Sequence, residues 1–455
     1  MGQKFVKFIV YGCQMNVADS ERMAGELAPL GYEGTEEQEE ADLIIINTCC
    51  VRETAEDKIY GKIGELKQLK ARNPKLVIGV TGCMAQKEGE KLRKRAPHVD
   101  FVLGTGQLKN LAATVEQIAN RRRHSVVNTD MEQGTDSFRG KAVRQGKVSA
   151  WIPIMYGCDN FCTYCIVPYV RGRERSRTME EILAEAREAL AEGYREITLL
   201  GQNVNSYGQK PSSLAETGVS FAALLKQVDA LPGIERVRFM TSHPKDLSLE
   251  VIEAIREGEH LCPHIHLPLQ HGSDRILKAM NRGYTAEKYR NLASLIRERL
   301  PQVSLTTDLI VGFPGESDAD FQATLDLVAE IGFDSAFTFL YSPRSGTPAA
   351  AMAAQVPEEV KKARLQALMA QQNKISLAIN EKLVGSIREV LVEGASKNDA
   401  TVWTGRTRHN KQVLWPHADE KPGDLISIKI NKAQTWLLKG EIHGTYADDA
   451  TILGG

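Results

Sequence analysis

The chain has 455 residues, of which 42% are hydrophobic and 25% are charged, and its formal net charge at pH 7 is −1. This length exceeds what one hydrophobic core usually serves, so we expect about two or three domains, each able to fold without disulfide bonds. The balanced charge excludes a global electrostatic attraction to nucleic acid or to an anionic membrane. Any polyanionic partner must therefore be bound by local patches.

No stretch of the sequence reaches the ~20 apolar residues that span a bilayer, and the first residues resemble neither a secretory signal nor a myristoylation site. We therefore expect a cytoplasmic protein without membrane contact, and a monomer. Because the cytosol is reducing, the eight cysteines favour metal binding or redox chemistry over disulfide bonds.

Residues 1–120 are predicted to form a parallel sheet covered by helices, because apolar runs alternate with segments of helical periodicity. The expected strands cover residues 5–10, 43–46, 76–80 and 99–103, and the expected helices cover residues 19–30, 54–70, 87–96 and 108–119. Residues 121–147 are polar and show no sustained periodicity, which is typical of a linker.

Each of the first three expected strands ends in a cysteine, at Cys13, Cys49 and Cys83. The carboxyl ends of parallel strands lie along one edge of a sheet, where ligands bind, so these three side chains should converge. Lone cysteines at strand ends are more often small buried residues, and it is their shared position that favours a site. The pair Cys49 and Cys50 leaves open which neighbour belongs to it.

Residues 148–377 are predicted to form a second α/β domain. Its strands are expected at residues 148–155, 196–200, 237–240, 264–267, 305–310 and 336–340, and its helices at 179–191, 221–230, 249–257, 286–300 and 318–330. Six strand–helix units predict an open, partial barrel of the TIM type, with its chemistry at the carboxyl ends of the strands.

The last part of the chain has a different sequence pattern. A helix at residues 358–381 leads into residues 378–446, where short strands are broken by Gly, Pro and Asn, and a tail follows at 447–455. This pattern predicts a small all-β barrel behind the two α/β domains.

Three cysteines in C-x3-C-x2-C spacing, Cys158, Cys162 and Cys165, follow the first strand of the second domain. Three thiolates on one tight loop can bind three irons of a 4Fe-4S cluster and leave the fourth iron open for another ligand. The alternative is a zinc site that lacks one ligand, but zinc loops normally use cysteine pairs spaced as C-x2-C or C-x4-C.

The stretch "IPIMYGCDNFCTYCIVPYVRGRERSR" resembles the radical S-adenosylmethionine (SAM) superfamily. The resemblance implies that SAM binds the open iron and that an electron from the cluster cleaves it to a 5′-deoxyadenosyl radical. With Cys13, Cys49 and Cys83 ahead of such a barrel, the chain is similar to the methylthiotransferase family. In that family the three bind a second 4Fe-4S cluster, which carries or supplies the inserted sulfur. The last domain resembles the RNA-binding TRAM module.

Five stretches are similar to the branch of this family that acts on N6-isopentenyl (dimethylallyl) adenosine beside the tRNA anticodon: "GCQMNVADSERM", "NTCCVRETAEDK", "TGCMAQKEGE", "LGQNVNSYG" and "HPKDL". The resemblance implies methylthiolation of that adenosine at C2, with the tRNA bound by its anticodon stem-loop. It also implies an electron donor, such as a flavodoxin or ferredoxin, and a sulfur source. Other branches act on threonylcarbamoyl adenosine or on an aspartate of a ribosomal protein. A non-catalytic iron–sulfur RNA-binding protein is a third alternative.

Two positions depart from the family pattern: Cys50 and His271 stand where Ser is common. His271 is on a strand-end loop and is expected to be able to alter substrate contacts. The family pattern selects Cys49 as the iron ligand and leaves Cys50 outside the cluster. Cys262 precedes a strand at its non-catalytic end and is expected to be structural.

Candidate SAM contacts lie where strands of the second domain end, at Gln202, Asn203, Ser242, His243, Gln270 and Asp308. The alternative for each is that it fixes a loop. Candidate RNA contacts are Arg171, Arg173, Arg175, Arg177, Trp403 and Trp415, because phosphates need cations and unstacked bases need aromatic surfaces. Alternating arginines also occur on solvated strands, and one or two tryptophans are expected in the barrel core. No general acid–base pair is expected beyond the two clusters.

Overall fold

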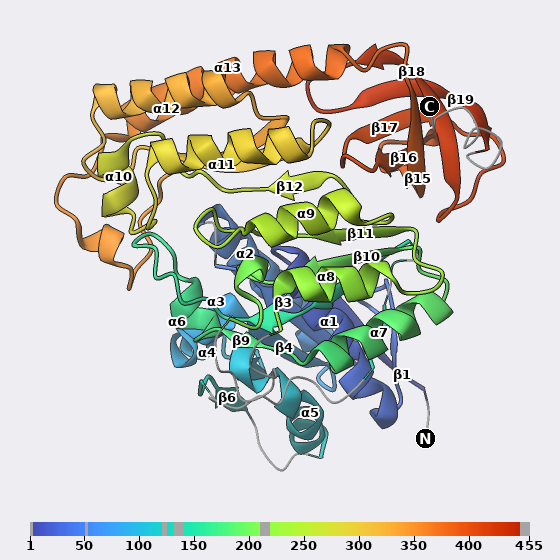
Figure 1. Ribbon diagram of the computed structural model, residues 1–455. Coiled ribbons are helices and arrows are strands. Elements are labelled where there is room, and N and C mark those ends of the chain that lie inside the picture. Colours follow the sequence, from blue (N-terminus) through green and yellow to red (C-terminus); the bar gives the residue numbers. More distant parts are fainter. Residues whose placement is uncertain are drawn as a thin grey trace.

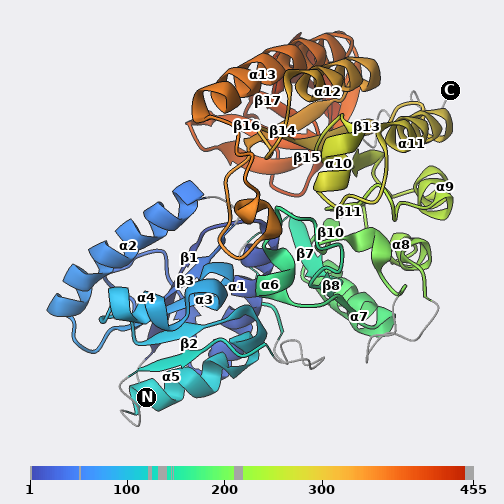
Figure 2. The same ribbon diagram turned by 90° about the vertical axis from the view of Figure 1, so that its left-hand side faces the viewer.

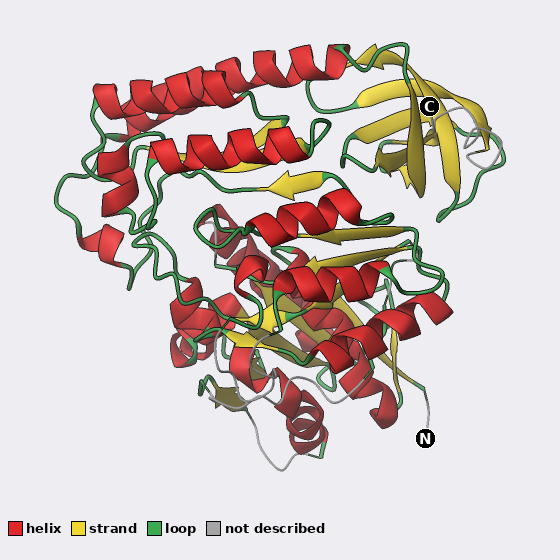
Figure 3. Cartoon of the chain, in the orientation of Figure 1, coloured by secondary structure: helices red, strands yellow, loops and turns green. Residues whose placement is uncertain are grey.

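The computed structural model describes residues 3–50, 53–120, 125–131, 141–144, 146, 148–209 and 219–445 of the chain. Figure 1 shows an N-terminal parallel sheet with its helices, a second set of strands covered by helices, and a C-terminal barrel beside the end of a long helix. In Figure 3 helices flank the strands of the first two parts, whereas the last part is drawn as strands and loops. The predicted fold class, α/β with a terminal all-β barrel, is confirmed.

The N-terminal sheet has six parallel strands in the order β2-β1-β3-β4-β5-β6. These strands are β1 (Lys4–Val10), β2 (Tyr32–Gly34), β3 (Leu43–Thr48), β4 (Val77–Gly82), β5 (Phe101–Leu103) and β6 (Val126–Asn128). The helices are α1 (Gln14–Leu27), α2 (Glu53–Arg72), α3 (Cys83–Glu88), α4 (Glu90–Arg95) and α5 (Leu111–Ala119). Strands β3 and β4 are buried at every residue because helices cover both faces of the sheet.

The differences from the expected elements have local causes. Helix α1 begins earlier than expected because buried polar side chains such as Asn16 hide its apolar periodicity. The helix expected at residues 87–96 is divided at Gly89, whose φ is +45°. Strands β2 and β6 have three residues each, too few for an alternating pattern to stand out. Strand β6 lies within residues 121–147, so the sheet continues into the expected linker.

The second domain has six parallel strands in two ladders, ordered β11-β10-β7 and β12-β13-β14. These strands are β7 (Ser149–Pro153), β10 (Glu196–Leu200), β11 (Arg236–Phe239), β12 (His264–His266), β13 (Ser304–Val311) and β14 (Ser335–Leu340). The main helices are α6 (Val167–Arg171), α7 (Met179–Ala191), α8 (Phe221–Asp229), α9 (Leu249–Glu257), α10 (Asp274–Ala279), α11 (Ala286–Arg299), α12 (Asp318–Ile331) and α13 (Glu358–Glu381). One hydrophobic core contains residues of all six strands.

The two ladders are joined by a single bridge between Val237 and Leu261. The N–H of Val237 donates to the carbonyl of His260 at 2.8 Å, and the N–H of Cys262 donates to the carbonyl of Val237 at 2.9 Å. The regular pairing ends there because the N–H of His264, which would continue it, donates instead to the carbonyl of Cys262 at 2.8 Å. Among the described residues β7 and β14 remain edge strands, so the predicted partial barrel is open.

The C-terminal strands close into a barrel in the order β15-β16-β17-β19-β18. They are β15 (Ile387–Ser396), β16 (Asp399–Thr407), β17 (Gln412–Pro416), β18 (Leu425–Ala433) and β19 (Leu438–Thr445). The barrel docks on the amino ends of β10 and β11, where Arg236 pairs with Glu389 at 2.6 Å and Arg238 donates to the carbonyl of Thr407 at 2.8 Å. It therefore lies at the end of the second domain opposite to the carboxyl ends of the strands (Figure 1).

Candidate iron–sulfur and SAM site

The cysteines in C-x3-C-x2-C spacing lie between β8 (Met155–Tyr156) and α6, on residues 157–166, which we call the cluster loop. Cys158 and Cys162 are buried, and Cys165 is half-buried. Burial raises the pKa of Cys158, and raises that of Cys165 to about 12. Both groups are therefore neutral thiols until a metal displaces their protons.

The segment 279–284, which begins with the last residue of α10, holds the cluster loop in place. Thr163 donates from its N–H and its hydroxyl to two carbonyls of this segment, at 3.0 and 2.8 Å. The amide of Asn281 donates to the carbonyls of Asn160 and Phe161 at 3.1 Å each. These bonds fix a backbone that has a φ of +45° at Phe161, which is unusual for a residue with a side chain.

A second set of cysteines, Cys13, Cys49 and Cys83, lies at the carboxyl ends of the adjacent strands β1, β3 and β4. Cys13 is exposed, and Cys49 and Cys83 are buried. The loop before Cys13 packs directly on Cys49, because a Cβ on Gly12 would lie 2.7 Å from the Cβ of Cys49. The structure thus brings the three predicted residues to one edge of the sheet.

Cys50 also lies at this edge. Its side chain is buried and packs with Cys83, Ile166 and Val170. A hydrogen bond from Cys50, followed by the charge of Arg171, lowers the pKa of Cys83 to about 6, against the opposing effect of burial. Cys49 therefore lies against the loop of Cys13, while Cys50 lies against Cys83, and the choice of Cys49 as the ligand stays a prediction.

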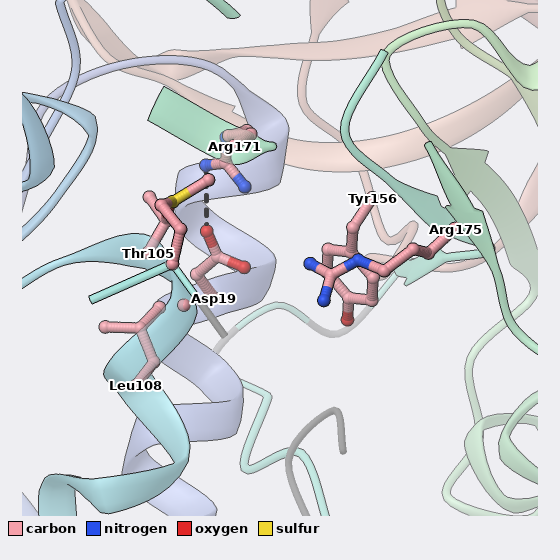
Figure 4. Close-up of a pocket in the computed structure, with 8 residues that line it drawn as sticks. Asp19, Thr105, Leu108, Tyr156, Arg171 and Arg175 are labelled. Carbon is pink, nitrogen blue, oxygen red and sulfur yellow. Dashed lines mark hydrogen bonds and ion pairs between the residues drawn. The ribbon is translucent and has the colours of Figure 1, made fainter. Parts of the chain in front are cut away.

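Helix α6 lies between the two sets of cysteines. It follows the cluster loop directly and packs against α3, which begins with Cys83, and Figure 2 shows these two helices side by side. Arg171, at the end of α6, donates to the carboxylate of Asp19 in α1 at 2.9 Å (Figure 4). The cluster loop and the N-terminal cysteines are therefore held together by one short helix and one buried ion pair.

The two cysteine sets carry the donors of an iron–sulfur cluster, with three thiols each. Among the described residues, no three His, Cys, Asp or Glu side chains converge on a position for one metal ion. A 4Fe-4S cluster instead takes its thiolates at separate corners of a cubane, so both sets retain the chemistry that a cluster with one open iron needs.

A group of buried polar atoms without hydrogen-bond partners among the described residues lies on the loops that follow β10 and β11. These atoms are Gln202 Oε1, Asn203 Oδ1, Asn205 Nδ2, Ser242 Oγ and His243 Nε2. Buried polar atoms are nearly always paired in folded proteins, so a polar ligand would satisfy them. SAM, with its amino, carboxylate and hydroxyl groups, fits this requirement. Asn205 is the member of the group that the sequence did not single out.

The remaining two predicted SAM contacts lie on the other ladder. Gln270 has a φ of +69°, and its N–H donates to the carbonyl of Asp308 at 2.8 Å. The carboxylate of Asp308 lies 3.4 Å from Nε2 of His266 and so already has a partner. On the first ladder, burial and then the charge of Arg282 lower the pKa of His243 to about 2, so its imidazole is neutral.

The expectation that His271 alters substrate contacts is wrong, because its side chain is fully buried. Its Nε2 lies 3.2 Å from Glu316 Oε1, and the other oxygen of Glu316 lies 3.3 Å from Arg364. Its Nδ1 accepts from the N–H of Ser273 at 3.0 Å. His271 therefore fixes the loop after β12 to the segment that precedes α12.

We expect His271→Ala to lower the free energy of unfolding by about 1–3 kcal/mol, because Glu316 then loses a partner in a buried site. The affinity for RNA should stay unchanged. Denaturant unfolding and RNA binding measure the two effects. His260→Ala, which removes a more exposed histidine 4.0 Å from Glu259, is the control and should change stability by less than about 1 kcal/mol. If His271→Ala instead lost RNA affinity while its stability stayed normal, His271 would be a contact to RNA.

Two of the four arginines predicted to contact RNA are structural. Arg171 and Arg177 are buried, and they pair with Asp19 at 2.9 Å and with Glu185 at 2.7 Å. A phosphate could reach them only by displacing these carboxylates, so the prediction of RNA contact is corrected for both. Arg175 is half-buried beside Tyr156 at the rim of a small pocket (Figure 4).

Arg173 is the arginine of this run that faces solvent, with 74% of its side chain exposed. It donates to Asp159 at 2.7 Å, and its guanidinium lies over the ring of Phe161, 5.4 Å from the centroid. Phe161 makes an edge-to-face contact with Tyr169 at 6.2 Å, and both rings are exposed. Neither aromatic residue was singled out from the sequence, although Phe161 lies within the cysteine motif and Tyr169 follows it closely.

The two predicted tryptophans differ as well. Trp415 is buried in the barrel core, and its Nε1 donates to Glu420 at 2.7 Å, so the prediction that it contacts RNA is corrected. Trp403 is half-buried and stacks on His417, with ring centroids 4.1 Å apart and planes 7° apart. Trp436 was not assigned to RNA but is 57% exposed. Cys262 is buried at the amino end of β12, away from both cysteine sets.

Comparison with known proteins defines the class first. The chain matches the Radical SAM superfamily over residues 152–328, the TRAM domain over residues 381–443 and the Uncharacterized protein family UPF0004 over residues 5–104. The structure is similar to the radical S-adenosylmethionine methyltransferase TsrM from Kitasatospora setae, with a TM-score of 0.56, 14% identity, and coverage of 87% of this chain and 79% of that chain. The open barrel with its cluster loop is thus that of a radical SAM protein.

The particular family follows from curated relatives. The tRNA-2-methylthio-N(6)-dimethylallyladenosine synthase of Moorella thermoacetica is 52% identical over 442 residues, which cover 97% of this chain and 98% of the relative. The synthase of the same name from Carboxydothermus hydrogenoformans is 52% identical, with coverage of 97% and 99%. The chain belongs to the family of tRNA-2-methylthio-N(6)-dimethylallyladenosine synthases.

Proposed function

We propose that this protein is a radical SAM methylthiotransferase that converts N6-isopentenyl adenosine beside the tRNA anticodon into its 2-methylthio derivative. The observation that carries the proposal is the pairing of two three-cysteine sets, one at the carboxyl ends of three parallel strands and one on the loop after β8, joined by α6. One set serves SAM, and the other provides a place for sulfur next to it. The 52% identity to named synthases over 97% of the chain supports the choice of substrate.

Each set of side chains has a role in this proposal. Cys158, Cys162 and Cys165 hold the radical cluster, and Cys13, Cys49 and Cys83 hold the auxiliary cluster. When bound, the radical cluster supplies the electron that cleaves SAM to a radical able to remove hydrogen from adenine C2. The protein's part is to orient SAM and to keep water away from the reaction. The buried, unpaired polar atoms after β10 and β11 provide the contacts that orient SAM.

The assay that tests this function uses the reconstituted protein with SAM, a reductant and tRNA that carries N6-isopentenyl adenosine. The 2-methylthio nucleoside should appear on digestion of the tRNA. Its absence, with product instead from threonylcarbamoyl tRNA or from a ribosomal protein aspartate, would move the protein to another branch. If SAM and reductant yield no 5′-deoxyadenosine with any substrate, the protein is an iron–sulfur RNA-binding protein and not an enzyme.

The exposed rings of Phe161 and Tyr169, with Arg173 above Phe161, provide a stacking surface at the rim of the cluster loop. Unpaired RNA bases stack on aromatic rings and on arginine planes. We place an anticodon-loop base on this surface. Trp403 and Trp436 lie in the barrel at the far end of the second domain. The barrel therefore binds a part of the tRNA other than the reacting base.

We expect Phe161→Ala to weaken binding of the anticodon stem-loop roughly 5- to 150-fold, because stacking contributes about 1–3 kcal/mol per base. Fluorescence anisotropy with a labelled stem-loop measures the effect. Val360→Ala on α13 removes a side chain with the same exposed fraction, 37%, and should leave binding unchanged. Equal affinity of Phe161→Ala and the unchanged protein would move the RNA away from the cluster loop.

The partners of this reaction complete the proposal. The clusters require electrons from a small donor such as a flavodoxin or ferredoxin, and the auxiliary cluster requires a source of sulfur. Among the described residues, no helix is long and apolar enough to cross a bilayer. We place the protein in the cytoplasm, where tRNA is found, and expect it to act as a monomer.

A further inference from the structure

The part of the chain that the structure describes contains seven buried arginines, and six of them share a feature that the seventh lacks. Each of these six arginines forms an ion pair with at least one carboxylate. The ion pairs are Arg22 with Glu185, Arg177 with Glu185, Arg171 with Asp19, Arg236 with Glu389, Arg238 with Glu196, and Arg364 with Glu316 and Asp318. None of the described carboxylates forms an ion pair with the seventh, Arg282, which is 4% exposed. A buried charge without a counter-charge is costly, so Arg282 needs another anion.

The contacts of Arg282 identify that anion. Its Nη1 donates to Sγ of Cys162 at 3.3 Å and lies 3.4 Å from the hydroxyl of Tyr164. Its Nε donates to the hydroxyl of Tyr284 at 3.0 Å, and its Nη2 donates to the carbonyl of Pro268 at 2.9 Å. Of these four partners, only Cys162 becomes an anion when it binds iron. The thiolate and the cluster behind it are therefore the counter-charge.

We propose that Arg282 is a positioning residue of the radical cluster, which donates a hydrogen bond to the Cys162 sulfur and raises the reduction potential of that cluster. The proposal rests on the assignment of Cys162 as a ligand of the radical cluster. Hydrogen bonds to the sulfurs and net charge set the potentials of iron–sulfur clusters. A reduced cluster is more negative than an oxidised one, so a nearby fixed cation stabilises the reduced state more. An arginine is suited to this role because it keeps its charge at every pH of interest.

The neighbouring residue separates this electrostatic role from a purely mechanical one. Asn281 also contacts the cluster loop, but its side chain is neutral and donates hydrogen bonds to the backbone carbonyls of Asn160 and Phe161, not to a sulfur. Its φ is +59°, which glycine adopts without strain. Asn281→Gly therefore removes the two hydrogen bonds to the cluster loop without removing the charge of Arg282. It is the matched control for a change at Arg282.

The test measures the midpoint potential of the radical cluster in the full-length chain with Cys13, Cys49 and Cys83 replaced by alanine, so that one cluster remains. Redox titration followed by electron paramagnetic resonance gives the potential, and iron analysis gives the occupancy. Arg282→Met and Arg282→Gln, which are both neutral, should shift the potential to more negative values at full occupancy. Asn281→Gly should keep the potential of the parent protein.

The result that overturns the proposal is a full cluster in either Arg282 variant with an unchanged potential, or an equal shift in Asn281→Gly. A third outcome is that both Arg282 variants lose iron with native circular dichroism spectra while Asn281→Gly keeps its iron. This outcome supports the proposal, because it shows that the cluster needs the contact between Arg282 and Cys162. A parent protein that binds no iron shows a different failure, that of the cluster assignment and not of the role of Arg282.

Discussion

Cys162→Ala should lower the iron content of the reconstituted protein from about eight to about four atoms per chain, because a 4Fe-4S cluster with one open iron depends on all three of its thiolates. The variant should also form no 5′-deoxyadenosine from SAM, since the remaining irons belong to the other cysteine set. Cys162 lies on a loop fixed at its backbone by Asn281, so the fold should survive the change. Iron and sulfide analysis, with chromatography of the nucleoside products, measures both effects.

Cys262→Ala is the matched control, because Cys262 is buried like Cys162, with 3% against 7% exposed, but lies at the amino end of β12. It should keep about eight irons and full activity, since each of two 4Fe-4S clusters holds four. A loss of iron in Cys262→Ala would show that the decrease reports general unfolding. Eight irons in Cys162→Ala would remove Cys162 from the cluster and, with it, the basis for the role of Arg282.

The positions of the main strands along the chain and the gathering of the cysteines could be predicted because both depend on local patterns. Runs such as residues 43–46 are apolar throughout, as buried parallel strands require, and a cysteine follows each within a few residues. The parallel arrangement then places those cysteines at one edge without any knowledge of side-chain packing. The same reasoning placed Gln202, Asn203, Ser242 and His243 on the strand-end loops where unpaired polar atoms gather.

The surface assignments failed where burial depends on partners far away in the sequence. Arg171 is paired with Asp19, which is 152 residues distant, and nothing in the run "RGRERSR" indicates this. Trp415 lies on a strand in which Val413 and Leu414 are apolar on opposite faces, so alternation does not show which face is the core. Arg282 carries no local signal, because its role depends on a loop that is 120 residues earlier.

Cys49→Ala should lose about four irons, whereas Cys50→Ser should keep all of about eight. The asymmetry follows from the positions of the two side chains. Cys49 lies against the loop of Cys13, and Cys50 packs on Cys83, where its hydrogen bond helps to lower the pKa of that thiol. On this prediction, Cys50 acts on a ligand and does not itself bind iron. Iron analysis of both variants in the otherwise unchanged chain measures the difference.

A second substitution, at Cys50, distinguishes a hydrogen-bond donor to Cys83 from a ligand of the iron. Serine can still donate a hydrogen bond to Cys83, and alanine cannot, so Cys50→Ala should keep its iron but shift the auxiliary cluster to a more negative potential. If Cys50 were the ligand, Cys50→Ala would lose iron and Cys49→Ala would keep it. If Cys50→Ala keeps its iron, the two adjacent cysteines would have different roles: Cys49 would bind iron, and Cys50 would adjust the charge on the Cys83 sulfur through its hydrogen bond.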